Sequence, residues 1–88
     1  MVQPDDWRLQ GQEGYLVGRE LKWSAWRTTR EGWDHDHCAF CWVKFGRKGA
    51  EGVDLSAGYV TADDEYHWVC EACFEDFRPT FQWAVQTE

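Results

Sequence analysis

Four cysteines in two Cys-x-x-Cys pairs are the residues of this chain with the clearest chemistry. Cys38 and Cys41 form the first pair, Cys70 and Cys73 form the second, and the chain contains no other cysteine. Two thiolates at this spacing can bind one side of a metal ion, and a second pair completes a tetrahedron. A site of four thiolates leaves no coordination position for a catalytic water. The pattern therefore predicts one structural Zn²⁺ ion as cofactor, bound by all four cysteines.

The same cysteines could instead form disulfides or a redox pair. Disulfide-stapled small domains are typical of secreted proteins, and the polar segment that begins at Met1 lacks the basic and apolar regions of a signal peptide. A redox Cys-x-x-Cys usually occurs as a single pair in a βαβ unit, a pattern absent here. No apolar run approaches the roughly 18 residues of a membrane span. We therefore expect reduced thiols, metal binding and a cytoplasmic protein.

Three histidines are alternative ligands. His35 and His37 precede the first cysteine pair, and His67 precedes the second. One of them could replace a cysteine, or His35 and His37 could bind a second metal ion together with Asp34 or Asp36. Because four cysteines already complete a tetrahedral set, we expect the histidines to lie outside the metal site.

The first half of the chain has weak secondary-structure signals. Residues 1–13 are predicted to be a loose, polar lead-in, and residues 15–17 form a short β-prone run. In the segment 14–27, alternation of Leu21, Trp23 and Ala25 with other residues favours a strand with one buried face. A short helix over residues 20–27 is the alternative, and residues 27–37 form a polar connection to the first pair.

The second half has clearer signals. Residues 42–45 predict a short strand, and the glycine-rich segment 46–58 predicts a mobile loop. Residues 59–61 and 66–69 predict a β-hairpin with an acidic turn at residues 62–65. A helix is predicted from about Glu71, because Phe74, Phe77 and Phe81 fall on one helical face. Pro79 should end or kink this helix, after which Phe81 and Trp83 are expected to pack back on the domain.

Four predicted elements follow one another over residues 38–78. They are a zinc knuckle, which is the turn that carries Cys38 and Cys41, then a loop, a β-hairpin and a helix. This order resembles the treble-clef class of zinc domains. The resemblance implies that Cys70 leaves the hairpin and that Cys73 lies in the first helical turn. Many such knuckles carry glycine soon after the second cysteine, where this chain has Trp42 and Val43, so the knuckle should be tighter or differently hydrogen-bonded. The resemblance indicates a fold and says little about function.

The predicted fold is therefore a small, zinc-stapled α+β domain with antiparallel strands and one C-terminal helix. At 88 residues the chain is expected to form a single domain. Within it, residues 1–37 form an N-terminal β extension, and residues 38–83 form the zinc-binding core with its helix and aromatic tail.

Charge and aromatic content indicate the kind of partner. The formal net charge is −7, and an acidic protein repels phosphate backbones and favours basic partners. Seven Trp, five Phe and three Tyr are more rings than a core of this size easily buries. Some rings should fill the core, and others should lie at the surface, where Trp and Tyr often anchor interfaces.

We therefore expect a non-catalytic zinc-binding module that binds another protein, such as a small acidic inhibitor or immunity-type protein with a basic target. The predicted contact surface consists of exposed tryptophans with an acidic rim: Trp23, Trp26, Trp33 and Trp42, with Asp34, Asp36, Asp63, Asp64 and Glu65. A structural subunit of a larger complex is one alternative. Nucleic-acid binding is the other, through the loop with Lys44, Arg47 and Lys48, joined by Arg27 and Arg30 and by stacking on Trp26 or Trp42.

The sequence matches neither of the two catalytic patterns that come nearest to it. A nucleoside-deaminase site would use Cys70 and Cys73 with an upstream His-x-Glu, but would leave the first cysteine pair unused. A nuclease of the HNH type would place a catalytic histidine on the hairpin, where His67 lies, yet the predicted helix supplies no partner for it. The sequence therefore predicts no enzymatic activity.

Overall fold

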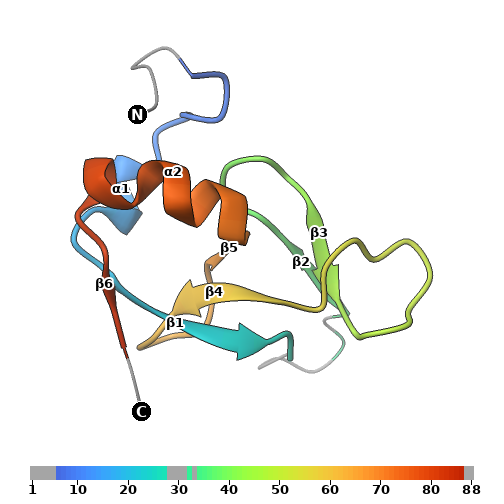
Figure 1. Cartoon of the computed structure of the whole chain (residues 1–88). Helices are drawn as coiled ribbons and strands as arrows, with labels where there is room; N and C mark the ends of the chain where they lie inside the picture. The colour runs from blue at the N-terminus through green and yellow to red at the C-terminus, as the bar shows by residue number, and fades with distance from the viewer. Residues whose placement is uncertain (1–5, 28–31, 33, 87–88) are drawn as a thin grey trace.

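The computed structural model describes residues 6–27, 32 and 34–86, and in this part of the chain one helix packs on a four-stranded sheet beside a two-stranded hairpin (Figure 1). The elements in chain order are α1 (Glu13–Leu16), β1 (Glu20–Ala25), β2 (His35–His37), β3 (Lys44–Gly46), β4 (Ala57–Thr61), β5 (Trp68–Val69), α2 (Glu71–Phe81) and β6 (Ala84–Val85). The predicted α+β class with antiparallel strands and a C-terminal helix is confirmed. The one-turn helix α1 and the strand β6 were not predicted.

The main sheet has the order β5-β4-β1-β6. Strand β1 pairs antiparallel with β4, from Leu21 opposite Thr61 to Ala25 opposite Ala57. It also pairs in parallel with β6, where Glu20 lies opposite Ala84. The strand predicted in the segment 14–27 is therefore confirmed at β1, and the alternative helix over residues 20–27 is wrong.

The β-prone run at residues 15–17 was predicted incorrectly, because residues 15 and 16 belong to α1. A single helical turn has no periodicity, and tertiary contacts hold this one in place. Leu16 is fully buried, and its carbonyl accepts a hydrogen bond from the indole of Trp83 at 2.8 Å. The next glycine, Gly18, has a φ of 72° and donates to the Phe81 carbonyl at 2.7 Å. Both contacts join α1 to the far end of the chain.

The hairpin β4–β5 is confirmed, with a shorter second strand than predicted. The acidic turn forms the local hydrogen bonds expected of it: the Asp64 carboxylate accepts from the Thr61 hydroxyl, and from the Tyr66 amide at 3.1 Å. Tyr66 and His67 precede β5, which contains only Trp68 and Val69. Side chains within the turn thus contribute to its stability, as expected of an acidic turn.

The knuckle lies at the end of a second hairpin that the sequence analysis did not predict. Strand β2 was assigned to a polar connection, yet His35 pairs with Gly46 and His37 with Lys44. The strand predicted at residues 42–45 begins only at Lys44, because Trp42 adopts a left-handed conformation with a φ of 71°. The missed β2 has only three residues, and its pairing partner rather than its own sequence determines it.

The glycine-rich segment is a loop over residues 47–56, while Gly46 belongs to β3 and Ala57 and Gly58 belong to β4. The predicted mobility of this loop stays a prediction. The loop is anchored to β3 at its C-terminal end, since the amides of Asp54 and Leu55 both donate to the Lys44 carbonyl at 3.0 Å.

Helix α2 buries Phe74, Phe77 and Phe81, as predicted, and Cys70 is its N-cap. The prediction that Pro79 ends the helix is wrong, since α2 continues to Phe81; the alternative, a kink at Pro79, stays a prediction. The proline lies in the last turn, where its missing N–H removes a single intrahelical bond. The helix instead ends at Gln82, which has a left-handed φ of 55° and donates its amide to the Arg78 carbonyl.

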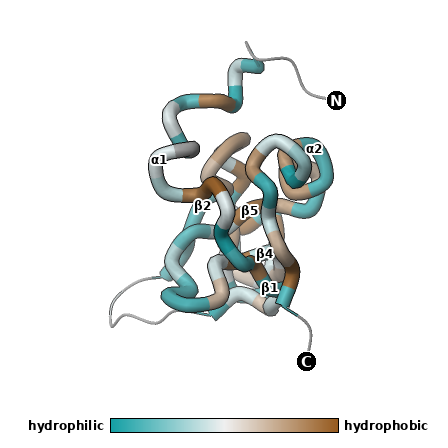
Figure 2. Tube along the Cα trace, turned by 90° about the vertical axis from the view of Figure 1, so that its left-hand side faces the viewer, coloured by the Kyte–Doolittle hydropathy of each residue, from teal (hydrophilic) through white to brown (hydrophobic). Residues whose placement is uncertain are grey.

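The core lies between α2 and the sheet and continues to the knuckle hairpin. Hydrophobic segments of the chain gather around β4 and β5, while hydrophilic segments lie toward the periphery (Figure 2). Trp83 is 4% exposed and packs against Phe74 and Phe81, which confirms the predicted packing of the aromatic tail. Gly58 lets β4 lie close to Phe45 of β3, because a Cβ at this position would lie 2.5 Å from the Phe45 ring.

Candidate metal centre

The four cysteine sulfurs converge on one point beside the start of α2. The Sγ atoms of Cys38, Cys41, Cys70 and Cys73 all lie within 4.8 Å of one another. A tetrahedral site with Zn–S bonds of about 2.3 Å separates its sulfurs by about 3.8 Å. The sulfurs of Cys41 and Cys70 are 3.5 Å apart, well beyond the roughly 2.05 Å of a disulfide, and all four cysteines are free. The cluster thus fits a single four-coordinate metal ion.

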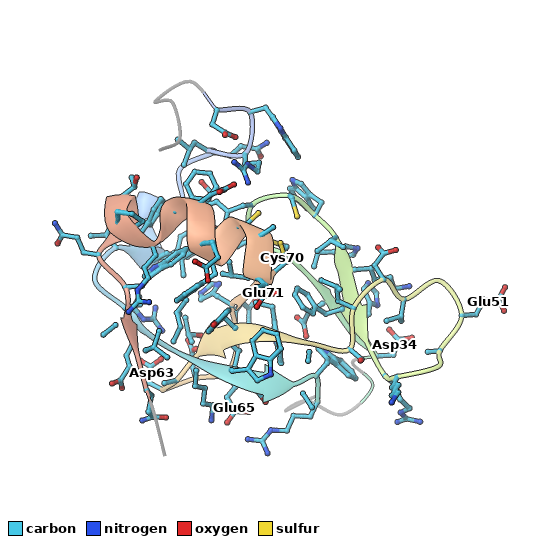
Figure 3. All side chains as sticks on the ribbon, in the orientation of Figure 1. Asp34, Glu51, Asp63, Glu65, Cys70 and Glu71 are labelled. Carbon is cyan, nitrogen blue, oxygen red and sulfur yellow. The ribbon has the colours of Figure 1, made fainter. Side chains whose placement is uncertain are left out.

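Different elements supply the two pairs. Cys38 follows β2 and Cys41 lies in the knuckle turn, while Cys70 follows β5 and Cys73 lies in the first turn of α2. The positions of Cys70 and Cys73 are those implied by the sequence order. Figure 3 shows the sulfur atoms gathered between the knuckle and the N-terminal end of α2. A metal ion here would therefore join the hairpin β2–β3 to the helix.

Among the described residues this is the one group of at least three His, Cys, Asp or Glu side chains that could hold a metal ion. The histidines do not belong to it. His35 contacts Asp34 at 2.6 Å and the ring of His37 at a centroid distance of 5.0 Å, but these residues form no such group. The alternative of a second metal site at residues 34–37 has no support in this geometry.

Backbone amides point at two of the sulfurs. The amides of Phe40 and Cys70 donate to the Cys38 sulfur at 3.4 Å, and the Cys73 amide donates to the Cys70 sulfur at 3.5 Å. Such N–H···S contacts stabilise thiolates and hold their orientation. At the knuckle, Trp42 adopts a left-handed backbone with a φ of 71°, which costs about 1–2 kcal/mol for a residue other than glycine.

Arg8 completes the surroundings of the cluster and was missed by the sequence analysis. Its guanidinium donates to the Cys73 sulfur at 3.5 Å and to the Asp76 carboxylate at 2.9 Å, and it lies 4.5 Å above the Phe77 ring. The opposite side of the guanidinium binds Asp6 at 2.8 Å. Arg8 therefore ties the chain to α2 within the lead-in that was predicted to be loose, whose residues 1–5 lie outside the described part of the chain. Arg8 would also offset the charge of a metal–tetrathiolate centre.

The thiols influence one another's protonation. Hydrogen bonds from Cys70 and then Cys73 lower the pKa of Cys38 to about 2. In turn, the hydrogen bond of Cys70 with Cys38 raises the pKa of Cys70 to about 12, and the hydrogen bond of Cys73 with Cys38 raises the pKa of Cys73. These opposite shifts have one cause, since a thiolate at Cys38 is stabilised by hydrogen bonds from the thiols of Cys70 and Cys73. A metal ion binds thiolates and displaces thiol protons, so its affinity should rise with pH.

The predicted contact residues are spread over several faces. Trp23 and Trp42 are 52% and 60% exposed, whereas Trp26 is half-buried and donates its indole N–H to Asp36 at 2.9 Å. Trp33 lies outside the described residues. Asp34 and Asp63 lie on opposite sides of the molecule in Figure 3, so the acidic members do not surround one patch.

Basic side chains of the chain itself pair with three of these acids. Arg19 binds Asp63 at 2.7 Å and Asp64 at 3.4 Å. Glu65 binds Arg27 and Lys22, each at 2.8 Å, and the hydrogen bonds from Arg27 and then Lys22 lower its pKa to about 2. These ion pairs thus fix the turn after β4 to β1 and its flanking residues. Because the three carboxylates are already paired, they would attract a basic partner less strongly.

His67, the candidate nuclease histidine, lies between two tyrosine rings. Its ring centroid is 4.7 Å from that of Tyr15 and 4.8 Å from that of Tyr66. Burial lowers the pKa of His67; Asp64 and Asp63 oppose this change, and Arg19 adds to it. The neutral form is therefore favoured in the folded protein.

We expect the free energy of unfolding to rise with pH across the interval between the lowered pKa of His67 and its ordinary value of about 6.5. Below this interval both states carry the proton, and above it both are neutral, so the histidine contribution is complete only above about pH 6.5. Urea unfolding of the zinc-loaded protein at pH 5.5, 6.5 and 7.5 measures how steeply the free energy of unfolding rises with pH. The His67→Gln variant should show a smaller slope, and equal slopes for the two proteins would contradict this assignment.

The chain matches no family model, and comparisons with curated proteins and with solved structures find no match. Within the described part of the chain, no helix has the length and apolar character needed to cross a membrane.

Proposed function

We propose that this chain is a non-catalytic zinc-binding module that binds a basic protein. The convergence of four thiols from the knuckle and from the start of α2 carries this proposal, because such a set is suited to a closed structural zinc site. The order of the hairpin β2–β3, the hairpin β4–β5 and the helix α2 around that site supports a treble-clef-like core. A closed site of four thiolates leaves the ion no open position for hydrolytic chemistry.

Exposed rings support the protein-binding part of the proposal. Several large apolar side chains stay outside the core despite the small size of the protein: Trp7, Tyr15, Val17, Trp23, Trp42 and Tyr66. Aromatic residues of this kind are enriched at interfaces and depleted elsewhere on protein surfaces. The rings are sufficient to form one or more anchors for a partner.

The charge supports a basic partner. The chain carries a net charge of −7, and ion pairs already engage Arg8, Arg19, Lys22 and Arg27. The basic loop invoked for nucleic acids is less favourable, since Lys44 and Arg47 share a surface hollow with Asp34 and Glu51. A small acidic inhibitor or immunity-type protein, directed at a basic target, is the specific form of this function that fits these properties.

The proposal is tested by capture on the zinc-loaded protein, followed by identification and purification of what it retains. We expect a basic protein in stoichiometric amount, whose association rate falls as the salt concentration rises. Zinc removal should abolish the capture, because the binding surface requires the folded domain. Recovery of nucleic acid alone would contradict the proposal and favour the loop with Lys44, Arg47 and Lys48.

A further inference from the structure

We propose that an aromatic cleft beside the metal centre binds a lysine or arginine side chain of the basic partner, an inference that rests on the proposed function. The cleft has a volume of about 530 Å³. Residues from α1, from the knuckle and from the segment before β5 line it. Six of them carry rings: Tyr15, His37, Trp42, Tyr66, His67 and Trp68.

The rings give the cleft its affinity for a cation. The faces of Trp and Tyr rings attract ammonium and guanidinium groups, and groups of aromatic rings are a recurrent way to bind such cations. Tyr15, Trp42 and Tyr66 are 44%, 60% and 52% exposed, so their rings are accessible to a partner. The ring contacts of His67 with Tyr15 and Tyr66 hold these three side chains together before any partner binds.

The lining that the structure describes also lacks the permanently charged basic side chains. The described residues that line the cleft include Asp36, Gln10 and Gln12 but no lysine or arginine. A phosphate-bearing ligand would find neither lysine nor arginine among these residues to neutralise it. A cationic side chain, in contrast, would be attracted by the electrostatic field of a protein whose net charge is −7.

The backbone of Trp42 is an independent observation that points to the same site. This residue has a φ of 71°, in the region that favours glycine, and yet its ring is largely exposed and contributes little to the core. A tryptophan at this position therefore opposes folding without a packing gain. Strained residues of this kind concentrate at binding and catalytic sites, where the side chain is needed for the function.

The first experiment uses three capped pentapeptides of four glycines around a central arginine, lysine or norleucine. Each is titrated into the zinc-loaded, ¹⁵N-labelled protein, and the indole and backbone signals of Trp42, Tyr66 and His67 are followed by NMR. We expect saturable shifts with arginine and lysine and none with norleucine. Equal shifts with norleucine, or shifts that map outside the cleft, would overturn the proposal.

Two variants test the role of the ring. Trp42→Gly removes the ring and relieves the left-handed backbone, so zinc content and melting temperature should be kept or raised while affinity for the arginine peptide falls about fivefold or more. Trp23→Ala is the matched control, because Trp23 is an exposed tryptophan on β1 that does not line the cleft. Equal affinities of Trp42→Gly and the wild-type protein would overturn the proposal.

The same variants separate this inference from the function on which it rests. If both the wild-type and the Trp42→Gly proteins capture the basic partner equally, the cleft is not the binding site, although the proposed function stands. If the wild-type protein captures no basic protein, the proposed function fails and this inference fails with it. Capture by the wild-type and Trp23→Ala proteins, with loss in Trp42→Gly, would support both.

Discussion

Replacement of Cys70 by serine is expected to abolish stoichiometric zinc binding and to unfold the region of residues 38–83. Binding of structural zinc is worth about 10–16 kcal/mol in zinc-finger peptides at neutral pH, whereas small domains are stable by only about 5–15 kcal/mol in total. Loss of one thiolate therefore removes a contribution as large as the whole stability. The cluster shows why the effect should spread, since its sulfurs come from both the knuckle and α2.

Cys70→Ser is the most informative of the four substitutions. Cys70 is the N-cap of α2, and its sulfur accepts the Cys73 amide. Serine is among the best N-cap residues, so the variant keeps a helix cap while it removes a metal ligand. Any unfolding can then be assigned to the metal centre rather than to a frayed helix.

The measurements are zinc content by elemental analysis and thermal unfolding by circular dichroism. Ala72→Ser is the matched control, because Ala72 is an exposed residue in the same helical turn and is not a ligand. It should keep one zinc ion per chain and lose at most about 0.5 kcal/mol. A chelator should reproduce the Cys70→Ser result in the wild-type protein. Wild-type zinc content together with an unchanged melting curve in Cys70→Ser would refute the prediction.

The sequence predicted best where the signal is local. The two cysteine pairs, the phenylalanines of α2 and the acidic turn after β4 are defined by spacings of a few residues, and the structure has each of these elements. The alternation around Leu21 likewise identified β1. It did not predict burial: Leu21 is fully buried, whereas Trp23, two residues further on, is half-exposed against the edge of Tyr59. Periodicity shows which side chains share a face, but the neighbouring elements determine how much of that face is covered.

The missed features depend on contacts between distant segments. Strand β6 is defined by its bonds to β1, including that from the Gln86 amide to the Leu21 carbonyl at 2.7 Å. Arg8 reaches Cys73 across 65 positions of sequence, and nothing in the local pattern around Arg8 indicates a role near a metal centre. At Trp42, by contrast, the absence of the glycine expected in a knuckle was a usable signal. It led us to expect a tighter or differently hydrogen-bonded knuckle, whereas the structure shows Trp42 in the left-handed conformation that glycine usually adopts.

Replacement of Phe40 by alanine is expected to destabilise the zinc-loaded protein by about 3–5 kcal/mol while zinc stoichiometry is kept. Phe40 is one of the two residues between the first pair of ligands, and it is fully buried. Its ring stacks on Phe77 of α2 with a centroid distance of 4.6 Å, and it contacts the edges of Phe81 and Trp83 at 5.3 and 5.8 Å. The knuckle is therefore joined to the helix by ring packing as well as through the metal ion.

Urea unfolding of the zinc-loaded proteins, with elemental analysis of each sample, separates these two connections. Trp7→Ala serves as the control, since Trp7 is 65% exposed and its removal should cost no more than about 0.5 kcal/mol. If Phe40→Ala behaved like Trp7→Ala, the metal ion alone would hold the knuckle on α2. A loss of several kcal/mol with one zinc ion still bound would show instead that ring packing stabilises the domain beyond what the metal supplies. The Phe40 ring would then help to fix the knuckle, and with it Trp42, relative to α2.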